Sequence, residues 1–152
     1  MDETTESFGT LDAALLTRLR AAAAAVFPPS LVLAAYAYGS RVRGRPRPDS
    51  DLDIGYYLHG YREGLTLPMR EELRLASAFA DAVGLEVDLR NLAEAPLELR
   101  GRVLEDGVRI HSADEPERVA LERYILARFH DYKDVFQQMH ETRLRALAKR
   151  GF

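Results

Sequence analysis

The sequence contains no cysteine, and this absence excludes two kinds of site. Without thiols the chain forms no disulfide bond and binds no metal through thiolate ligands. His59, His111 and His140 are scattered along the chain without the spacing of metal ligands, so packing or surface positions are favoured for them. A metal site in this protein is therefore expected to use oxygen ligands.

Long apolar runs and a surplus of positive charge are also absent. The apolar run at residues 21–25 is far too short to span a bilayer, and residues 1–7 lack the apolar region of a signal peptide. We therefore expect a cytoplasmic protein without membrane contact. The net charge of −3 disfavours direct nucleic-acid binding. A length of 152 residues with 47% hydrophobic content predicts a single domain over residues 1–152.

The most informative segment begins with two short apolar runs, at residues 31–38 and 54–58. Both are bounded by Gly, Pro, Asp or Ser, and both predict buried strands. Asp51 and Asp53 introduce the second run. Because alternate residues of a strand point to the same face, these two carboxylates project side by side and repel one another. Such a pair is suited to a cation, and Mg²⁺ commonly binds through one or two carboxylates together with substrate phosphates.

Each part of this segment is common by itself, since Asp-x-Asp is often a turn or cap and Gly-Ser often marks a strand end. The combination is rarer: a strand, Gly39-Ser40, a ten-residue insert, and Asp51-Leu52-Asp53 entering a second strand. It resembles the nucleotidyltransferases of the polymerase β superfamily. Its residues 38–44 and 49–54 are similar in sequence to those of their minimal nucleotidyltransferase (MNT) branch. The resemblance implies that Asp51 and Asp53 bind two Mg²⁺ ions and that ATP is the donor substrate.

The insert fits a phosphate-binding role under this interpretation. Small residues at Gly39 and Ser40 let backbone amides and a hydroxyl approach a triphosphate closely. Arginines then recur at every second position from 41 to 47, and a guanidinium presents a planar fork of donors to phosphate oxygens. Arg41 and Arg43 are the candidate nucleotide contacts, and the alternative is that they are solvated loop charges.

A third carboxylate is expected, because two-metal phosphoryl transfer commonly uses one to help hold the catalytic metal. The alternating run at residues 85–89 places Glu86 and Asp88 on one face of a further strand. In the resembled family the third acid stands in a Val-Asp-Leu context, which corresponds to Asp88. Glu86 shares the face and remains the alternative. An edge strand with ordinary polar residues on its outer face is the structural alternative.

Periodicity along the chain predicts an α/β fold of the polymerase β-like palm type, with a small mixed sheet, helices mainly on one side and a long C-terminal helix. Helices are expected at residues 10–27, 67–83, 96–105 and 115–149, and strands at 31–38, 51–58, 85–89 and 108–111. The apolar stripe of the second helix is expected to be Leu73, Ala76, Phe79, Ala80 and Val83.

Residues 113–150 form a C-terminal helical segment with an apolar, aromatic-rich stripe. The stripe consists of Leu121, Tyr124, Ile125, Phe129, Tyr132, Val135, Phe136 and Met139. Its first half is expected to cover the sheet. A helix of this length spans roughly 50 Å, so its part beyond about residue 137 would project and offer a partner surface.

The resemblance also implies a biological role. MNT proteins of this size are typically antitoxins of HEPN–MNT (type VII) pairs, which transfer AMP from ATP to a tyrosine of the HEPN ribonuclease. The expected partner is therefore a HEPN toxin in a hetero-oligomer, and Asp51, Asp53 and Asp88 are the expected catalytic residues. Two alternatives stay open: a small-molecule transferase of the aminoglycoside-modifying type, and a non-catalytic antitoxin that occludes its toxin.

Overall fold

The computed structural model describes residues 13–39 and 51–150, and their elements follow the predicted order. The helices are α1 (Ala13–Val26), α2 (Met69–Val83), the 3₁₀ helix η2 (Leu92–Glu94), α3 (Leu97–Asp106) and α4 (Glu115–Lys149). The strands are β1 (Val32–Tyr38), β2 (Leu52–Leu58), β3 (Val87–Asn91) and β4 (Val108–Ser112). The sheet has the order β3-β2-β1-β4, in which β1 is antiparallel to β2 and β4, and β3 is parallel to β2. The predicted small mixed sheet is confirmed.

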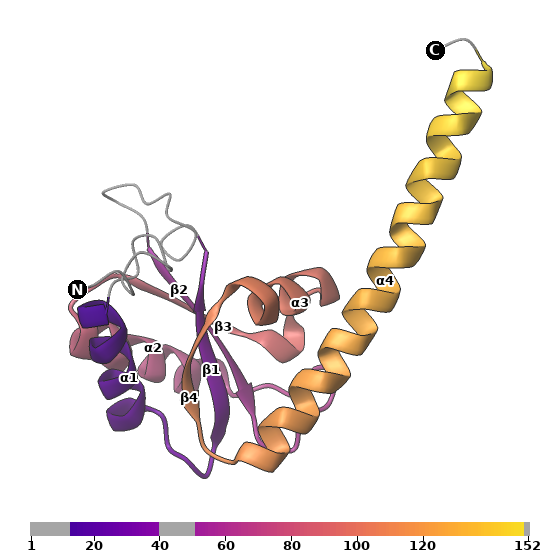
Figure 1. The fold of residues 1–152 in the computed structure, drawn as a ribbon. Coiled ribbons are helices and arrows are strands. Elements are labelled where there is room, and N and C mark those ends of the chain that lie inside the picture. Colours follow the sequence, from indigo (N-terminus) through magenta and orange to yellow (C-terminus); the bar gives the residue numbers. More distant parts are fainter. Residues whose placement is uncertain (1–12, 40–50, 151–152) are drawn as a thin grey trace.

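Helices cover both faces of the sheet, so the prediction that they lie mainly on one side was wrong. Helices α1 and α2 pack on one face, whereas α3 and the first half of α4 pack on the other (Figure 1). The cause lies in the two central strands, where β1 and β2 are buried at almost every position. A strand that is apolar on both faces needs a cover on each of them.

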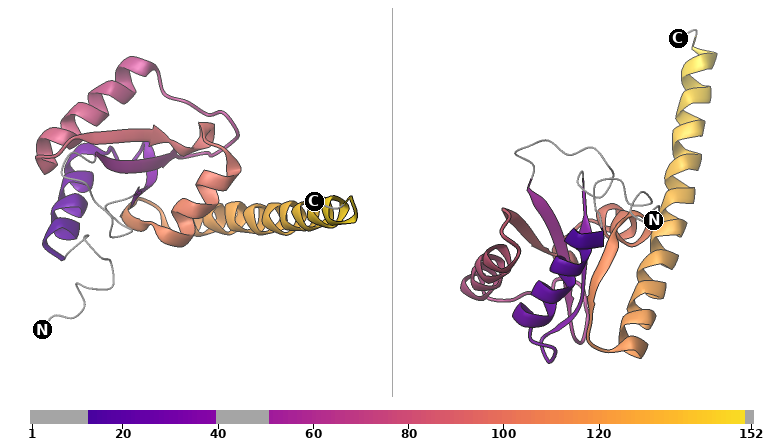
Figure 2. Two further views of the ribbon diagram at one scale, coloured as in Figure 1. Left: turned by 90° about the horizontal axis from the view of Figure 1, so that it is seen from above. Right: turned by 60° about the vertical axis from the view of Figure 1, so that its left-hand side comes forward.

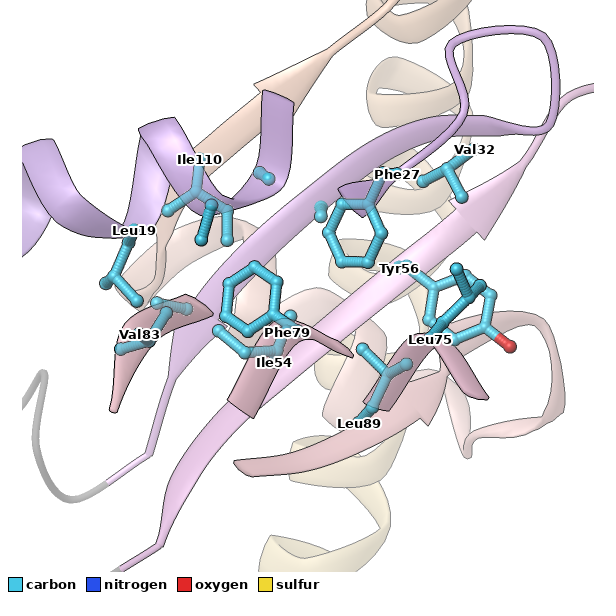
Figure 3. Close-up of a cluster of buried hydrophobic side chains, with 14 of the residues drawn as sticks. Leu19, Phe27, Val32, Ile54, Tyr56, Leu75, Phe79, Val83, Leu89 and Ile110 are labelled. Atoms are coloured by element: carbon cyan, nitrogen blue, oxygen red, sulfur yellow. The ribbon is translucent and has the colours of Figure 1, made fainter. Parts of the chain in front are cut away.

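The core on the α1 and α2 side is built around two stacked aromatic rings (Figure 3). The ring centroids of Phe27 and Phe79 lie 5.3 Å apart. In α2 the buried side chains are Leu75, Phe79 and Val83, at i, i+4 and i+8. Leu73, which was predicted in this stripe, is 62% exposed. It lies two residues from Leu75, about 200° around the helix, and therefore points away from the sheet.

Helix α4 has the predicted bounds, and its C-terminal part extends well past the rest of the molecule (Figures 1 and 2). Its last buried side chain is Phe129, and every residue from 130 to 150 is exposed. The helix therefore leaves the domain earlier than the predicted position near residue 137. Within the described ranges, no helix combines the length and the apolar character that crossing a membrane requires.

The departure of α4 is set by its contact with α3. A Cβ atom at Gly101 would lie 2.0 Å from the Phe129 ring, so the absence of a side chain allows the two helices to approach closely. Beyond this point Glu105, near the end of α3, accepts a 2.8 Å hydrogen bond from His130. Helix α3 ends at Asp106 and the chain turns back into β4, so within residues 13–39 and 51–150 no further element covers α4.

Candidate active site

The sheet brings two of the predicted acids together at one end. Asp53 is the register partner of Asp88 on the parallel strand β3 and of Tyr38 on the antiparallel strand β1. Its neighbours Leu52 and Ile54 belong to the core on the α1 and α2 side. By strand alternation Asp53 faces the opposite side, where α3 lies. Three strands thus contribute one polar side chain each to the same end of the sheet.

Gly39 directly follows β1 and lies at this end of the sheet. Its φ of 92° lies in the left-handed region, which residues other than glycine rarely adopt. A Cβ atom at this position would lie 2.1 Å from Asp53 Oδ2. The position therefore requires glycine for two independent reasons, and the backbone of Gly39 lies directly against the Asp53 carboxylate.

A cleft of about 390 Å³ lies between this end of the sheet and α3. Its lining consists of Tyr38, Gly39, Asp53, Asp88, Arg90, Leu99, Arg102, Val103 and Asp106. Arg90, Arg102 and Asp106 were not predicted as site residues from the sequence. The alternation of β3 was a usable signal for Arg90, which stands two residues after Asp88 on the same face. Arg102 and Asp106 reach the cleft only because α3 packs over the sheet.

The pKa of the Tyr38 hydroxyl reflects the charges of the cleft. The pKa of its hydroxyl is raised to about 12, mainly by burial and also by the nearby charges of Asp53 and Asp88, while Arg90 opposes the shift. A phenol with this pKa stays protonated at neutral pH and is available as a hydrogen-bond donor. The same shift indicates that both carboxylates act on one region of the cleft.

The other predicted site residues are placed less closely. Asp51 is exposed and directly precedes β2. Ser40, Arg41 and Arg43 lie outside the described residues. Glu86, the alternative third acid, lines a separate groove on the α2 side of β3 together with Leu73, whereas Asp88 lines the cleft.

The donor chemistry of the cleft suits magnesium. Over the described part of the chain, no three or more His, Cys, Asp or Glu side chains form a group that could hold a metal ion. The pair Asp53 and Asp88 nevertheless supplies hard oxygen donors on adjacent strands. Mg²⁺ requires little more from a protein, because it keeps several waters and takes further ligands from substrate phosphates. The carboxylate pair therefore fits this ion when it arrives with a nucleotide.

The model of the polymerase β nucleotidyltransferase family matches residues 28–116, and the chain belongs to this family. The matched region runs from the start of β1 to the start of α4 and includes Gly39, Asp53 and Asp88. A search of curated proteins finds no significant match.

Solved structures with the same fold come from toxin–antitoxin complexes. One is a toxin–antitoxin crystal structure with AMP-PNP, with a TM-score of 0.58 and 18% identity over 87% of this chain and 97% of the other. Another contains the tri-AMPylated Shewanella oneidensis HEPN toxin with its MNT antitoxin, with a TM-score of 0.58 and 18% identity over 86% and 97%. A third is an MntA–HepT complex, with a TM-score of 0.54 and 16% identity over 88% and 97%. At these identities the likeness establishes the fold.

Proposed function

We propose that this chain transfers AMP from ATP to a tyrosine hydroxyl of a HEPN-type ribonuclease, and that it acts as the antitoxin of a type VII toxin–antitoxin pair. The observation that carries the proposal is the in-register pair of Asp53 and Asp88, which faces one cleft with the backbone of Gly39 against it. The structural relatives support the choice of donor and acceptor, because they include a complex with AMP-PNP and a complex with an AMPylated HEPN toxin.

The charges of the cleft suit a nucleoside triphosphate. Arg90 and Arg102 line it from the sheet and from α3. Arginine side chains bind phosphate oxygens through paired donors. Ser40, Arg41 and Arg43, which directly follow Gly39 in the sequence, are proposed to complete the phosphate-binding end. The acidic pair and the basic pair would thus bracket the α-phosphate.

Asp51, Asp53 and Asp88 are proposed to hold two Mg²⁺ ions. When bound, these ions would neutralise the triphosphate and lower the pKa of the acceptor hydroxyl. The reaction forms a bond between the tyrosine oxygen and the α-phosphorus and breaks the bond to the bridging oxygen of the β-phosphate. Pyrophosphate leaves, and the hydroxyl proton passes to a carboxylate oxygen of the cleft. The chain's own contribution is to orient these groups in line.

The test mixes the purified chain with a HEPN-type ribonuclease, labelled ATP and Mg²⁺. Label is expected to enter the partner, and its intact mass should rise in units of AMP. Asp53→Asn should reduce transfer by about a thousandfold or more, since it removes charge at the reacting centre. Asp81→Asn, an exposed carboxylate on α2, is the matched control and should retain full transfer.

The rival functions give different results in this experiment. Transfer to an aminoglycoside but not to the protein would assign the chain to the small-molecule class. Full protection of cells by Asp53→Asn, with an unmodified toxin, would establish occlusion in place of catalysis. Equal affinity for an ATP analogue with Mg²⁺ and with EDTA would contradict the metal assignment.

A further inference from the structure

The apolar face that fastens α4 to the domain continues, uncovered, along the projecting half of the helix. Its buried part consists of Leu121, Ile125 and Phe129. Tyr132, Phe136 and Met139 continue the same spacing of three and four residues and therefore lie on the same face. They are 39%, 59% and 59% exposed. The rings of Tyr132 and Phe136 lie against each other, with centroids 5.9 Å apart. We call Tyr132, Phe136 and Met139 the distal stripe.

The charges around the distal stripe are arranged unevenly. Asp134 and Glu141 lie seven residues apart, on the side of the helix opposite the stripe. Lys133 and Arg143 follow Phe129 and Met139 by four residues each and thus border the stripe. The final stretch, residues 143–150, contains Arg143, Arg145, Lys149 and Arg150 and no acid. Lys133 lies 4.0 Å from Glu105 of α3, and Asp131 flanks the stripe on the other side. The stripe is therefore apolar at its centre and basic at its far end, although the chain as a whole is acidic.

The distal stripe is connected to the catalytic cleft. A groove of about 300 Å³ lies between α3 and α4 and is lined in part by Tyr132, Phe136 and Arg102. Arg102 also lines the cleft that contains Asp53 and Asp88. The groove beside the stripe and the cleft therefore share the Arg102 side chain.

We propose that the distal stripe and the adjoining groove are the docking surface for the acceptor protein, and that the surface fits an amphipathic helix with an acidic border. This inference rests on the proposed function and adds to it the surface that delivers the hydroxyl. An apolar helix face binds another helix through such a stripe. The basic stretch at residues 143–150 favours an acidic partner and steers its approach. Docking here holds the acceptor helix beside Arg102, so that its tyrosine enters the cleft.

The charge pattern distinguishes this partner from a second copy of the chain. A parallel pair of α4 helices would bring the basic stretches at residues 143–150 of both copies together. Like charges facing each other across a helix pair are destabilising. An antiparallel pair would cover the groove beside Arg102 and block access to the cleft from this side. The acceptor helix is the occupant that satisfies both the charges and the connection to the cleft.

The test is a triple variant, Tyr132→Ser, Phe136→Ser and Met139→Ser, assayed on the same HEPN-type ribonuclease with labelled ATP. All three side chains are solvent-exposed, so the fold should persist. The matched control, Asp134→Ser, Gln138→Ser and Glu141→Ser, has the same spacing two positions further on, on the opposite side. Circular dichroism should show equal helicity for both variants.

The distal-stripe variant should raise the KM for the acceptor protein about 30-fold or more, while kcat and the affinity for an ATP analogue stay unchanged. The control should behave as the wild type. An unchanged acceptor KM in the distal-stripe variant, with efficient wild-type transfer, would overturn the docking surface and leave the proposed function intact. Absence of wild-type transfer to the HEPN protein would remove the proposed function and, with it, this inference.

Sedimentation of the chain alone gives a second readout. We expect a monomer at assay concentration. A stable dimer that the distal-stripe variant abolishes would assign the stripe to a second copy and overturn the proposal.

Discussion

The two ends of the sheet differ in how their charged side chains are paired. At the end where β2 finishes, His59 Nδ1 lies 2.8 Å from Glu117, and the Gly60 amide donates a 2.9 Å hydrogen bond to the same carboxylate. His59 Nε2 lies 2.7 Å from the carbonyl oxygen of Pro29. These contacts connect the start of α4 to two loops. At the cleft end, Asp88 and Arg90 form no ion pair with any residue of the described ranges.

Arg100, in the helix that lies between these two ends, follows the paired pattern. Its side chain is only 6% exposed, and it forms an ion pair with Glu63 at 3.0 Å. It also donates a hydrogen bond to the Tyr61 hydroxyl. The contrast shows that charges are compensated where elements must be fastened together. At the cleft Arg102 is paired with Glu98 at 3.3 Å, whereas Asp88 and Arg90 have no such pair within the described residues, and four substitutions test this contrast.

The largest effect is expected at the third carboxylate. Asp88→Asn should lower AMP transfer by about a thousandfold while leaving nucleotide binding largely intact, because it removes charge beside Asp53 without removing volume. Glu86→Gln is the control two residues away, in the groove on the other side of β3, and should have little effect. The measurement is single-turnover transfer from labelled ATP. The reverse ranking would move the third acid to Glu86.

Gly39→Ala should reduce transfer about a hundredfold, because a displaced reacting group loses its alignment. The added Cβ would force the Asp53 carboxylate out of place. Gly64→Ala, in the loop between β2 and α2, is the matched control: its φ is also positive, at 75°, but nothing lies within 4 Å of the added atom. Both variants should lose about 1 kcal/mol of stability. Equal activity in the two would show that Asp53 tolerates displacement.

Arg100→Leu should destabilise the fold by about 2 kcal/mol, since it breaks a charge-assisted contact and leaves the Tyr61 hydroxyl without its donor. Transfer by the folded fraction should remain. Arg74→Leu, which breaks an exposed ion pair with Glu71, should change stability by less than about 0.5 kcal/mol. Urea denaturation measures both variants. A loss of activity without a loss of stability would place Arg100 in the catalytic machinery.

The smallest effect concerns pH. The hydrogen bond to Glu117 raises the pKa of His59 above its usual value of 6.5. A raised folded-state pKa stabilises the fold fully below the unfolded value, and this contribution disappears as pH rises through the folded pKa. His59→Gln should therefore cost less than about 1 kcal/mol near pH 6 and progressively less at higher pH. His140→Gln, on the exposed part of α4, is the control for loss of an imidazole. A difference that grows with pH would contradict the assignment.

Local patterns in the sequence determined much of this protein. Strand alternation predicted the faces of Asp53 and Asp88 because β2 and β3 were recognisable as strands, and the choice of Asp88 over Glu86 came from the family resemblance. The bounds of α4 followed from its long periodicity, and in the structure the Asp114 side chain caps the helix by accepting a hydrogen bond from Glu117 N at 3.0 Å. The family resemblance came from the same short segment, around Gly39.

The tertiary structure decided what depends on the approach of one element to another. Leu75 rather than Leu73 is buried because the angle at which α2 meets the sheet selects one row of its side chains. Arg102 and the groove beside the distal stripe belong to the site only because the backbone at Gly101 allows α3 to approach Phe129. A sequence pattern records which face of an element is apolar, but packing alone determines which two faces meet and where the cover ends.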